Sequence, residues 1–346
     1  MNAATQPCRG YPAHRLTGSS AGSGTMFEPQ PRRRFLCATD LSPRSQRAVQ
    51  RAAILARQAG ADLMLVHAVD ERHPERLVRM MAERAATELR AQLEDIGLPR
   101  TSVGGIAVRV GRPMQVLRDS AHEWEADLIV AAAPARRDYE RVFGTTGERL
   151  VRALELPVLF VHRAPRGAYA KAVVATDLSD GDVRMARTSA LLRIFEAAHT
   201  TIMHACGPSY DGVMSMVGIR QAQVAAYARQ WKSRLCRELA RHAAAAGICP
   251  SQVSVVQESA RPFVAIQRIV RQTEPDLLAI GTSRYFMLKR MLLGSVADEV
   301  LRKIDCDILV ISPAAAARPQ FRLRRLSALA GAATQDAGTR DAALLN

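Results

Sequence analysis

The stretch "CATDLSP" at residues 37–43 has a near copy in "VATDLSD" at residues 174–180. Each copy ends a short apolar run with Ala-Thr-Asp and continues into an amphipathic segment, a pattern typical of a β-strand that turns into a helix. A strand and turn written twice predict a duplicated fold.

The spacing of matching residues supports this duplication. Asp40 and Asp177 lie 137 residues apart, and so do His67 and His204, whereas the later motifs "DLIV" and "DLLA" lie 149 residues apart. Duplicates keep a constant offset except where residues have been inserted. The second copy has therefore gained a net 12 residues, which we assign to residues 207–220. We interpret this insertion as a surface loop, and a cover over a crevice or a partner contact stays open.

Short apolar runs alternate with longer amphipathic stretches in both copies, which predicts a βαβ succession and a mostly parallel sheet. Five strands are expected in each copy. They lie at 34–40, 62–69, 104–110, 127–133 and 157–162, and at 172–177, 200–206, 252–257, 276–282 and 307–312. Helices in the first copy are expected near 43–59, 74–96, 112–124 and 146–155.

The domain limits follow from composition. The two ends of the chain are rich in Ala, Gly, Ser, Pro, Gln and Arg without periodicity, which predicts flexible tails. A short linker at residues 163–171 favours two halves that pack together. We expect a tail at 1–33, domains at 34–163 and 171–313, and a second tail at 314–346, with Met26 as an alternative start.

Composition favours a soluble globular chain. At 346 residues and 48% hydrophobic content, the chain is long enough for two cores. No run of about 18 apolar residues occurs, so we expect no membrane span. The first 25 residues lack the apolar core of a secretory signal, which leaves the cytoplasm as the expected location.

Charge and cysteine content argue against two other classes of site. Of the net charge of +15, seven charges lie in residues 1–34 and 314–346, so we expect a solvated basic surface and no specific nucleic-acid partner. Six cysteines are scattered without a C-x-x-C pair. We therefore expect reduced thiols, no disulfide framework and no metal site.

The clearest chemical signal is "GTSRYFMLKRMLLGSVADEV" at residues 281–300, after the fourth strand of the second copy. A glycine lets the backbone approach a phosphate closely, and a helix N-terminus offers unpaired N–H groups. Gly281, Gly294 and Ser295 therefore predict a phosphate cradle.

The first copy has lost most of this pattern. Ala132 and Ala135 stand where the second copy has Gly281 and Arg284, and only eight residues separate Ala135 from the Gly144–Thr145 pair. We do not expect nucleotide binding there. Three arginines in this segment, Arg136, Arg137 and Arg141, either hold another anion or lie in a solvated loop; the loop is favoured, and both interpretations stay open.

Two pairs of polar residues sit at strand ends. Asp40 and Asp177 either bind a ligand or cap the next helix; the cap is favoured for Asp40, and Asp177 is the one we assign to a ligand. His67 and His204 have no metal-ligating neighbours in sequence, so we expect hydrogen-bonded structural histidines.

The Ala-Thr-Asp-Leu-Ser strand end, the histidine after strand two and the glycine pattern after strand four together resemble the universal stress protein family, in a tandem two-domain form. The resemblance implies an α/β fold with two tandem Rossmann-like (HUP-type) domains, each with a five-stranded parallel sheet flanked by helices. It also implies that strand five of each half forms the contact between the halves.

The glycine pattern marks the ATP-binding subgroup of that family, and members without it do not bind ATP. Carried over by position, the resemblance puts adenine near Ala175, Asp177 and Ala205, and ribose and phosphates near Gly281, Gly294, Ser295 and Val296. Arg284 stands where the family has its second glycine, and it either blocks the phosphate path or supplies a cation to it.

We therefore expect a cytoplasmic universal stress protein that binds a nucleotide, ATP, in its second domain. We expect Mg²⁺ only as a complex with the ATP. No nucleophile elbow, Walker A lysine or pair of catalytic carboxylates is present, so we assign no catalytic residue and expect no enzyme. Two alternatives stay open: a scaffold or adaptor that holds a protein or an anionic lipid-like ligand, and a slow ATP hydrolase. A homodimer and a further protein partner are also open.

Overall fold

The protein's computed structural model describes most of the two repeats. The described residues are 32–99, 102–133, 151, 154–176, 188, 192–196, 198–206, 237, 253–259, 261–282, 295–312 and 314–315. The predicted insertion at 207–220 and most of the helix expected near 146–155 lie outside them.

Strands and helices alternate along both halves. The first half contains β1 (Arg34–Ala38), α1 (Pro43–Ala59), β2 (Asp62–Val69), α2 (Glu75–Asp95), β3 (Val103–Val110), α3 (Pro113–Glu123), β4 (Leu128–Ala132) and β5 (Val158–Val161). The second half contains β6 (Lys171–Thr176), β7 (His199–Cys206), β8 (Val253–Ser259), α9 (Pro262–Thr273), β9 (Leu277–Gly281), α10 (Ser295–Lys303) and β10 (Asp307–Ile311). All ten predicted strands are confirmed, with ends that differ by at most two residues.

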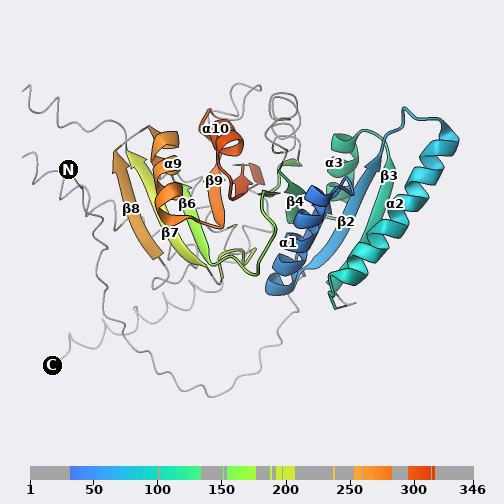
Figure 1. Ribbon diagram of the computed structural model, residues 1–346, viewed down its shortest axis with the longest axis horizontal. Helices are drawn as coiled ribbons and strands as arrows, with labels where there is room; N and C mark the ends of the chain where they lie inside the picture. Colours follow the sequence, from blue (N-terminus) through green and yellow to red (C-terminus); the bar gives the residue numbers. More distant parts are fainter. Residues whose placement is uncertain are drawn as a thin grey trace, which may run out of the picture.

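The ten strands form one continuous sheet in the order β3-β2-β1-β4-β5-β10-β9-β6-β7-β8. All strand pairs within each half are parallel, and the halves meet where β5 pairs antiparallel with β10. Leu159 pairs with Leu309 at the centre of this junction. The two halves therefore lie side by side (Figure 1), and strand five of each half makes the contact that the resemblance implied.

The antiparallel junction relates the halves by an approximate two-fold axis. Its pairs Ile308–Phe160 and Val310–Val158 stand symmetrically about the central leucine pair. Because the strands of the two halves run in opposite directions, their carboxyl ends lie at opposite edges of the sheet. Any strand-end sites of the two halves are consequently separate.

Local sequence explains where the helices begin and end. Ser42 caps α1 by accepting a hydrogen bond from the backbone N of Ser45 at 3.3 Å, and Gly60 closes that helix with a left-handed φ of 60°. Pro113 and Pro262 open α3 and α9, where a missing N–H costs no helical hydrogen bond.

Two hydrophobic layers cover the faces of the sheet. Alternate strand residues such as Phe35 and Leu309 face a cluster built with α1, whereas Leu36 and Ile308 face a cluster built with α3, α9 and α10. Both clusters run through the β5–β10 junction, so the halves share their cores. No helix in the described part of the chain is long and apolar enough to span a membrane.

Candidate functional site

The candidate site lies at the carboxyl edge of the second half, where the strand order reverses. From β6 the chain first moves outward to β7 and β8 and then returns to β9 on the other side of β6. In an open parallel sheet, ligands bind in the crevice at such a reversal. Ala175, near the end of β6, pairs with Ile280 of β9 and with Met203 of β7, so three strand ends converge there.

The described members of the predicted nucleotide site gather at this edge. Ala175, Ala205 and Val296 are partly buried and pack against the same core cluster, on the face covered by α9 and α10. Gly281 is the last residue of β9, and Ser295 is the first of α10, as the sequence predicted. The three remaining predicted residues, Asp177, Arg284 and Gly294, lie outside the described residues.

Small side chains stand at these strand ends. Ala175 and Ala205 present only a methyl group, and Gly281 presents none. Backbone N–H and C=O groups at these positions can therefore be approached closely.

Thr282 is a polar residue of this edge that the sequence reasoning did not single out. It directly follows Gly281 and is only 6% exposed, and its Oγ1 has no hydrogen-bond partner within the described part of the chain. A buried hydroxyl without a partner is costly unless a ligand or water satisfies it. Its position beside the predicted glycine was the signal available in the sequence.

The first half has no such hydroxyl. The residue equivalent to Thr282 is Ala133, and the two positions make matching backbone hydrogen bonds: Ala133 N donates to Val161 O at 2.9 Å and Thr282 N to Ile311 O at 3.1 Å. The backbone is thus the same in the two repeats at this point, and only the side chain differs. The two edges therefore differ in residue type at this position, as they also do at Gly281 and Ala132.

The two equivalent histidines are structural. His67 Nδ1 lies 2.9 Å from the carbonyl oxygen of Thr39, and His204 Nδ1 lies 2.8 Å from that of Thr176. Each ring nitrogen thereby donates to the end of the neighbouring strand and ties the two strand ends together. This confirms the predicted hydrogen-bonded role, and no group of three metal-ligating side chains occurs among the described residues.

Asp40 supports the turn into α1. Its carboxylate accepts a hydrogen bond from the backbone N of Ser42 at 2.9 Å, and Leu41 between them adopts a left-handed φ of 63°. Burial raises the pKa of Asp40, but hydrogen bonds from Ser42 and Ser45 outweigh it and lower the pKa overall. Ser42 is therefore the residue that caps α1, and Asp40 holds the backbone of this cap in place.

Two of the six cysteines lie in the described core. Cys37 and Cys306 are buried and free. Burial raises the pKa of Cys306 to about 12 and that of Cys37 still further. These two thiols are inert core residues, as expected.

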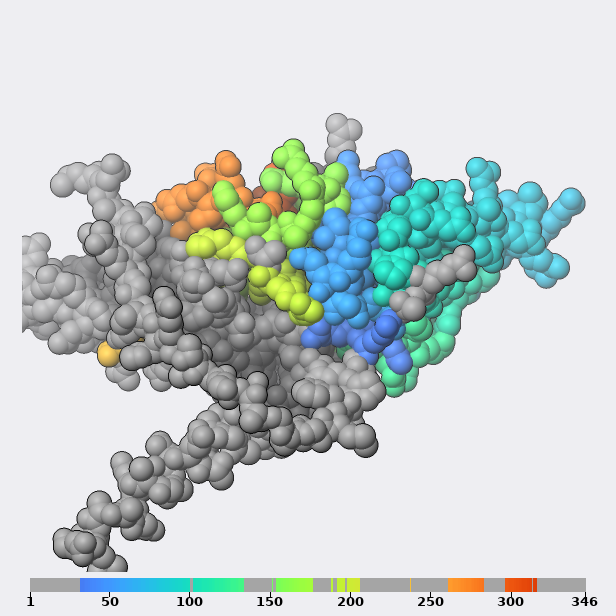
Figure 2. Space-filling view, turned by 90° about the horizontal axis from the view of Figure 1, so that it is seen from below, coloured from blue at the N-terminus to red at the C-terminus, as the bar shows by residue number. Residues whose placement is uncertain are grey.

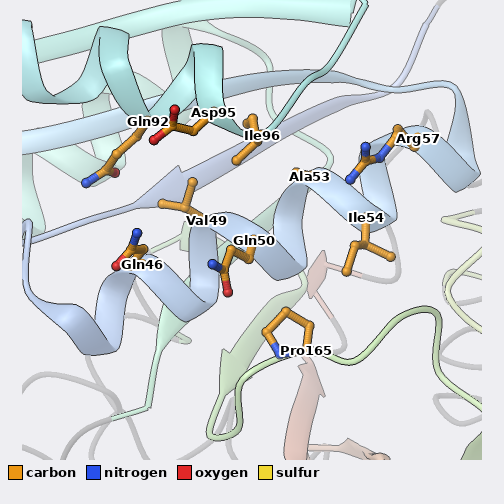
Figure 3. A pocket seen from close by; sticks show the side chains of 10 residues that line it. All are labelled: Gln46, Val49, Gln50, Ala53, Ile54, Arg57, Gln92, Asp95, Ile96 and Pro165. Atoms are coloured by element: carbon orange, nitrogen blue, oxygen red, sulfur yellow. The ribbon is translucent and has the colours of Figure 1, made fainter.

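A groove of about 450 Å³ lies on the helical layer of the first half, away from these strand ends. Figure 3 shows side chains from α1 and from the end of α2 facing it, with Pro165 of the linker at its lower side. Its polar groups are Gln46, Gln50, Arg57, Gln92 and Asp95. No residue of the predicted nucleotide site lines this groove.

Comparison with known proteins gives a family and a fold. The universal stress protein family model matches the chain twice, at residues 31–162 and 168–312. No curated protein sequence matches the chain.

Solved structures of tandem length match the whole fold. A putative universal stress protein from Pseudomonas aeruginosa is 18% identical with a TM-score of 0.58, over 84% of this chain and 97% of that one. A universal stress protein from Archaeoglobus fulgidus is 16% identical with a TM-score of 0.57, over 81% and 98%. A second Pseudomonas aeruginosa protein, described as functionally unknown, is 18% identical with a TM-score of 0.57, over 84% and 96%.

Proposed function

Because the chain belongs to the universal stress protein family, we propose that its second half binds a nucleotide, with ATP as the expected ligand. We propose further that binding of this ligand regulates a cytoplasmic stress response. The observation that carries the proposal is the edge around Gly281. There, small residues stand at three strand ends, and Thr282, which follows Gly281, carries a buried hydroxyl without a partner in the described residues.

The chemistry of this edge fits a nucleotide in two parts. The methyl groups of Ala175 and Ala205 offer a small apolar surface to an adenine ring, and Asp177, the next residue in the sequence after β6, has a carboxylate that can accept hydrogen bonds from an amine or a hydroxyl. The start of α10 at Ser295 offers free N–H groups and a partial positive charge to phosphates. Thr282 supplies one further hydroxyl.

Two residues decide how phosphates are held. In the sequence, Gly294 directly precedes α10 and has no side chain, and Arg284 lies between β9 and α10 with a guanidinium group. A guanidinium pairs with phosphate oxygens through two parallel hydrogen bonds. We propose that Arg284 supplies a cation to the phosphates, and that any Mg²⁺ enters bound to ATP.

The first half does not take part in this binding. It has alanine at positions 132, 133 and 135, where the second half has Gly281, Thr282 and Arg284. We therefore propose one nucleotide per chain, with the first half as a structural partner. We propose a binding protein and no enzyme, since no residue is available by sequence to orient an attacking water.

The test is to purify the full chain, denature it and identify any released nucleotide by mass spectrometry, with ATP titrations by calorimetry in Mg²⁺. Gly294→Asp places a negative side chain where phosphates would lie. Gly144→Asp makes the same change at the equivalent position of the first half. Wild type and Gly144→Asp should bind ATP with a stoichiometry near one, and Gly294→Asp should not.

Other results would reject parts of this proposal. Wild-type protein that releases no nucleotide and gives no calorimetric signal would remove it and favour the adaptor alternative. Equal occupancy in the wild type and in Gly294→Asp would move the site elsewhere. Release of inorganic phosphate that disappears in Gly294→Asp would support the slow hydrolase.

A further inference from the structure

A buried polar cluster joins the two halves beside the β5–β10 junction. Arg51 of α1 and Asp307 of β10 form an ion pair, with 3.2 Å between Nε and Oδ2, and their side chains are only 6% and 2% exposed. Tyr169 of the linker donates its hydroxyl to Asp307 Oδ2 at 2.7 Å. The guanidinium of Arg51 also lies 4.0 Å from the centre of the Tyr169 ring.

Backbone groups complete the cluster. The backbone N atoms of His162 and Arg163 donate to Asp307 Oδ1 at 2.9 Å and 3.3 Å, and Arg51 Nη1 donates to the carbonyl oxygen of Gly167 at 2.6 Å. The space-filling view shows the green surface of residues 154–176 bordering the blue surface of α1 (Figure 2). Groups from the first half, the linker and the second half thus meet around a buried ion pair.

The cluster occurs on one side of the two-fold axis only. Matching registers, Ile129 with Val158 and Leu278 with Ile308, make Pro157 the equivalent of Asp307. The repeat offset of 137 makes Thr188 the equivalent of Arg51. Pro157 and Thr188 are both buried and carry no charge, so no ion pair joins these two equivalent positions.

We propose that the Arg51–Asp307 cluster makes the junction surface of the first half specific for that of the second half, and excludes pairing between like halves of two chains. Two first halves joined through β5 would bury each Arg51 against Pro157 of the other copy. Two second halves joined through β10 would bury each Asp307 against Thr188. A buried charge without a partner is strongly unfavourable, so only the unlike pair satisfies both groups.

This selectivity matters because the junction is otherwise self-complementary. The paired residues around Leu159 and Leu309 are apolar on both strands. An exposed apolar edge of this kind pairs readily with a copy of itself. Like pairing would link chains end to end, since each chain would still expose its other half.

A cysteine at the centre of the junction reports such pairing directly. In the native junction residue 159 faces residue 309, whereas in a pair of first halves it would face residue 159 of the other chain. In a full-length Leu159→Cys chain refolded with oxidised glutathione, a disulfide between the substituted positions of two chains therefore forms only through like pairing. The bridged peptide is identified by mass spectrometry, which separates it from bridges of the native cysteines.

Three chains in this background test the proposal. Leu159→Cys alone should give little bridged peptide, and adding Arg51→Met should raise its yield about tenfold or more, because no cation is then left unpaired. Adding Tyr169→Phe instead weakens the cluster but keeps both charges, so its yield should stay near that of Leu159→Cys. If Arg51→Met does not refold, Arg51→Met with Asp307→Asn removes both charges and should give the same increase.

Two results would overturn the proposal. An unchanged yield on removal of Arg51 would show that the cation does not exclude like pairing. An equal increase with Tyr169→Phe would show that any weakening of the junction has this effect, and that charge pairing carries no selectivity.

Discussion

Replacing Asp307 by Asn is expected to destabilise the folded chain by about 3 kcal/mol, because a buried charge loses its partner. The Arg51 guanidinium would lose the negative charge that it faces, while it keeps the Gly167 carbonyl and the Tyr169 ring. The side chains of Arg51 and Asp307 are only 6% and 2% exposed, so water cannot solvate a charge that has lost its partner. Burial raises the pKa of Asp307, and the Tyr169 hydroxyl and the Arg51 charge offset only part of that rise, so the ionised carboxylate depends on these partners.

The assay is urea unfolding of the full chain, followed by circular dichroism and tryptophan fluorescence. Arg51→Met alone should cost a comparable amount, whereas Arg51→Met with Asp307→Asn should recover about 2 kcal/mol of the summed loss, since no unpaired charge remains. Glu75→Gln, which breaks the exposed pair with Arg79 on α2, serves as the matched control and should change nothing measurable. A loss below about 1 kcal/mol for Asp307→Asn, or additive single losses, would refute the reasoning.

Three further results are expected. Gly104→Ala should destabilise the first half by about 1–3 kcal/mol and alter tryptophan emission, because the added Cβ would overlap the Trp124 ring; unchanged stability would contradict this contact. Iodoacetamide should label Cys306 at pH 8 about tenfold more slowly in the native chain than in the urea-unfolded chain, and equal labelling rates would show that the thiol is accessible. The free energy of unfolding should also fall as the pH rises from about 9 towards 12, because the Cys306 thiol ionises at a lower pH in the unfolded chain than in the native chain. His67→Leu and His204→Leu should each lower the free energy of unfolding by about 1 kcal/mol, because each loses one hydrogen bond. Only His204→Leu should weaken ATP binding in calorimetry, and equal effects of the two variants on binding would contradict a single site in the second half.

Most of the candidate site could be predicted from sequence because it consists of short motifs at strand ends. Gly281 and Ser295 stand where the pattern of strand, loop and helix predicted them. Thr282 was missed for a physical reason: a threonine after a strand is ordinary, and its significance depends on burial and on the absence of a partner among the described residues. Asp177, Arg284 and Gly294 stay predictions.

The order of strands and helices follows from local pattern alone. Apolar runs of period two, amphipathic stretches and Arg-Pro helix starts act within a few residues, and the repeat spacing relates the two halves without any contact information. The family resemblance implied a contact through strand five of each half, and the tertiary structure shows that β5 and β10 pair antiparallel and join the two sheets into one. It also decides the roles of Arg51 and Asp307, which by residue type belong on a surface. Their burial results from the approach of distant segments, and no local pattern records that approach.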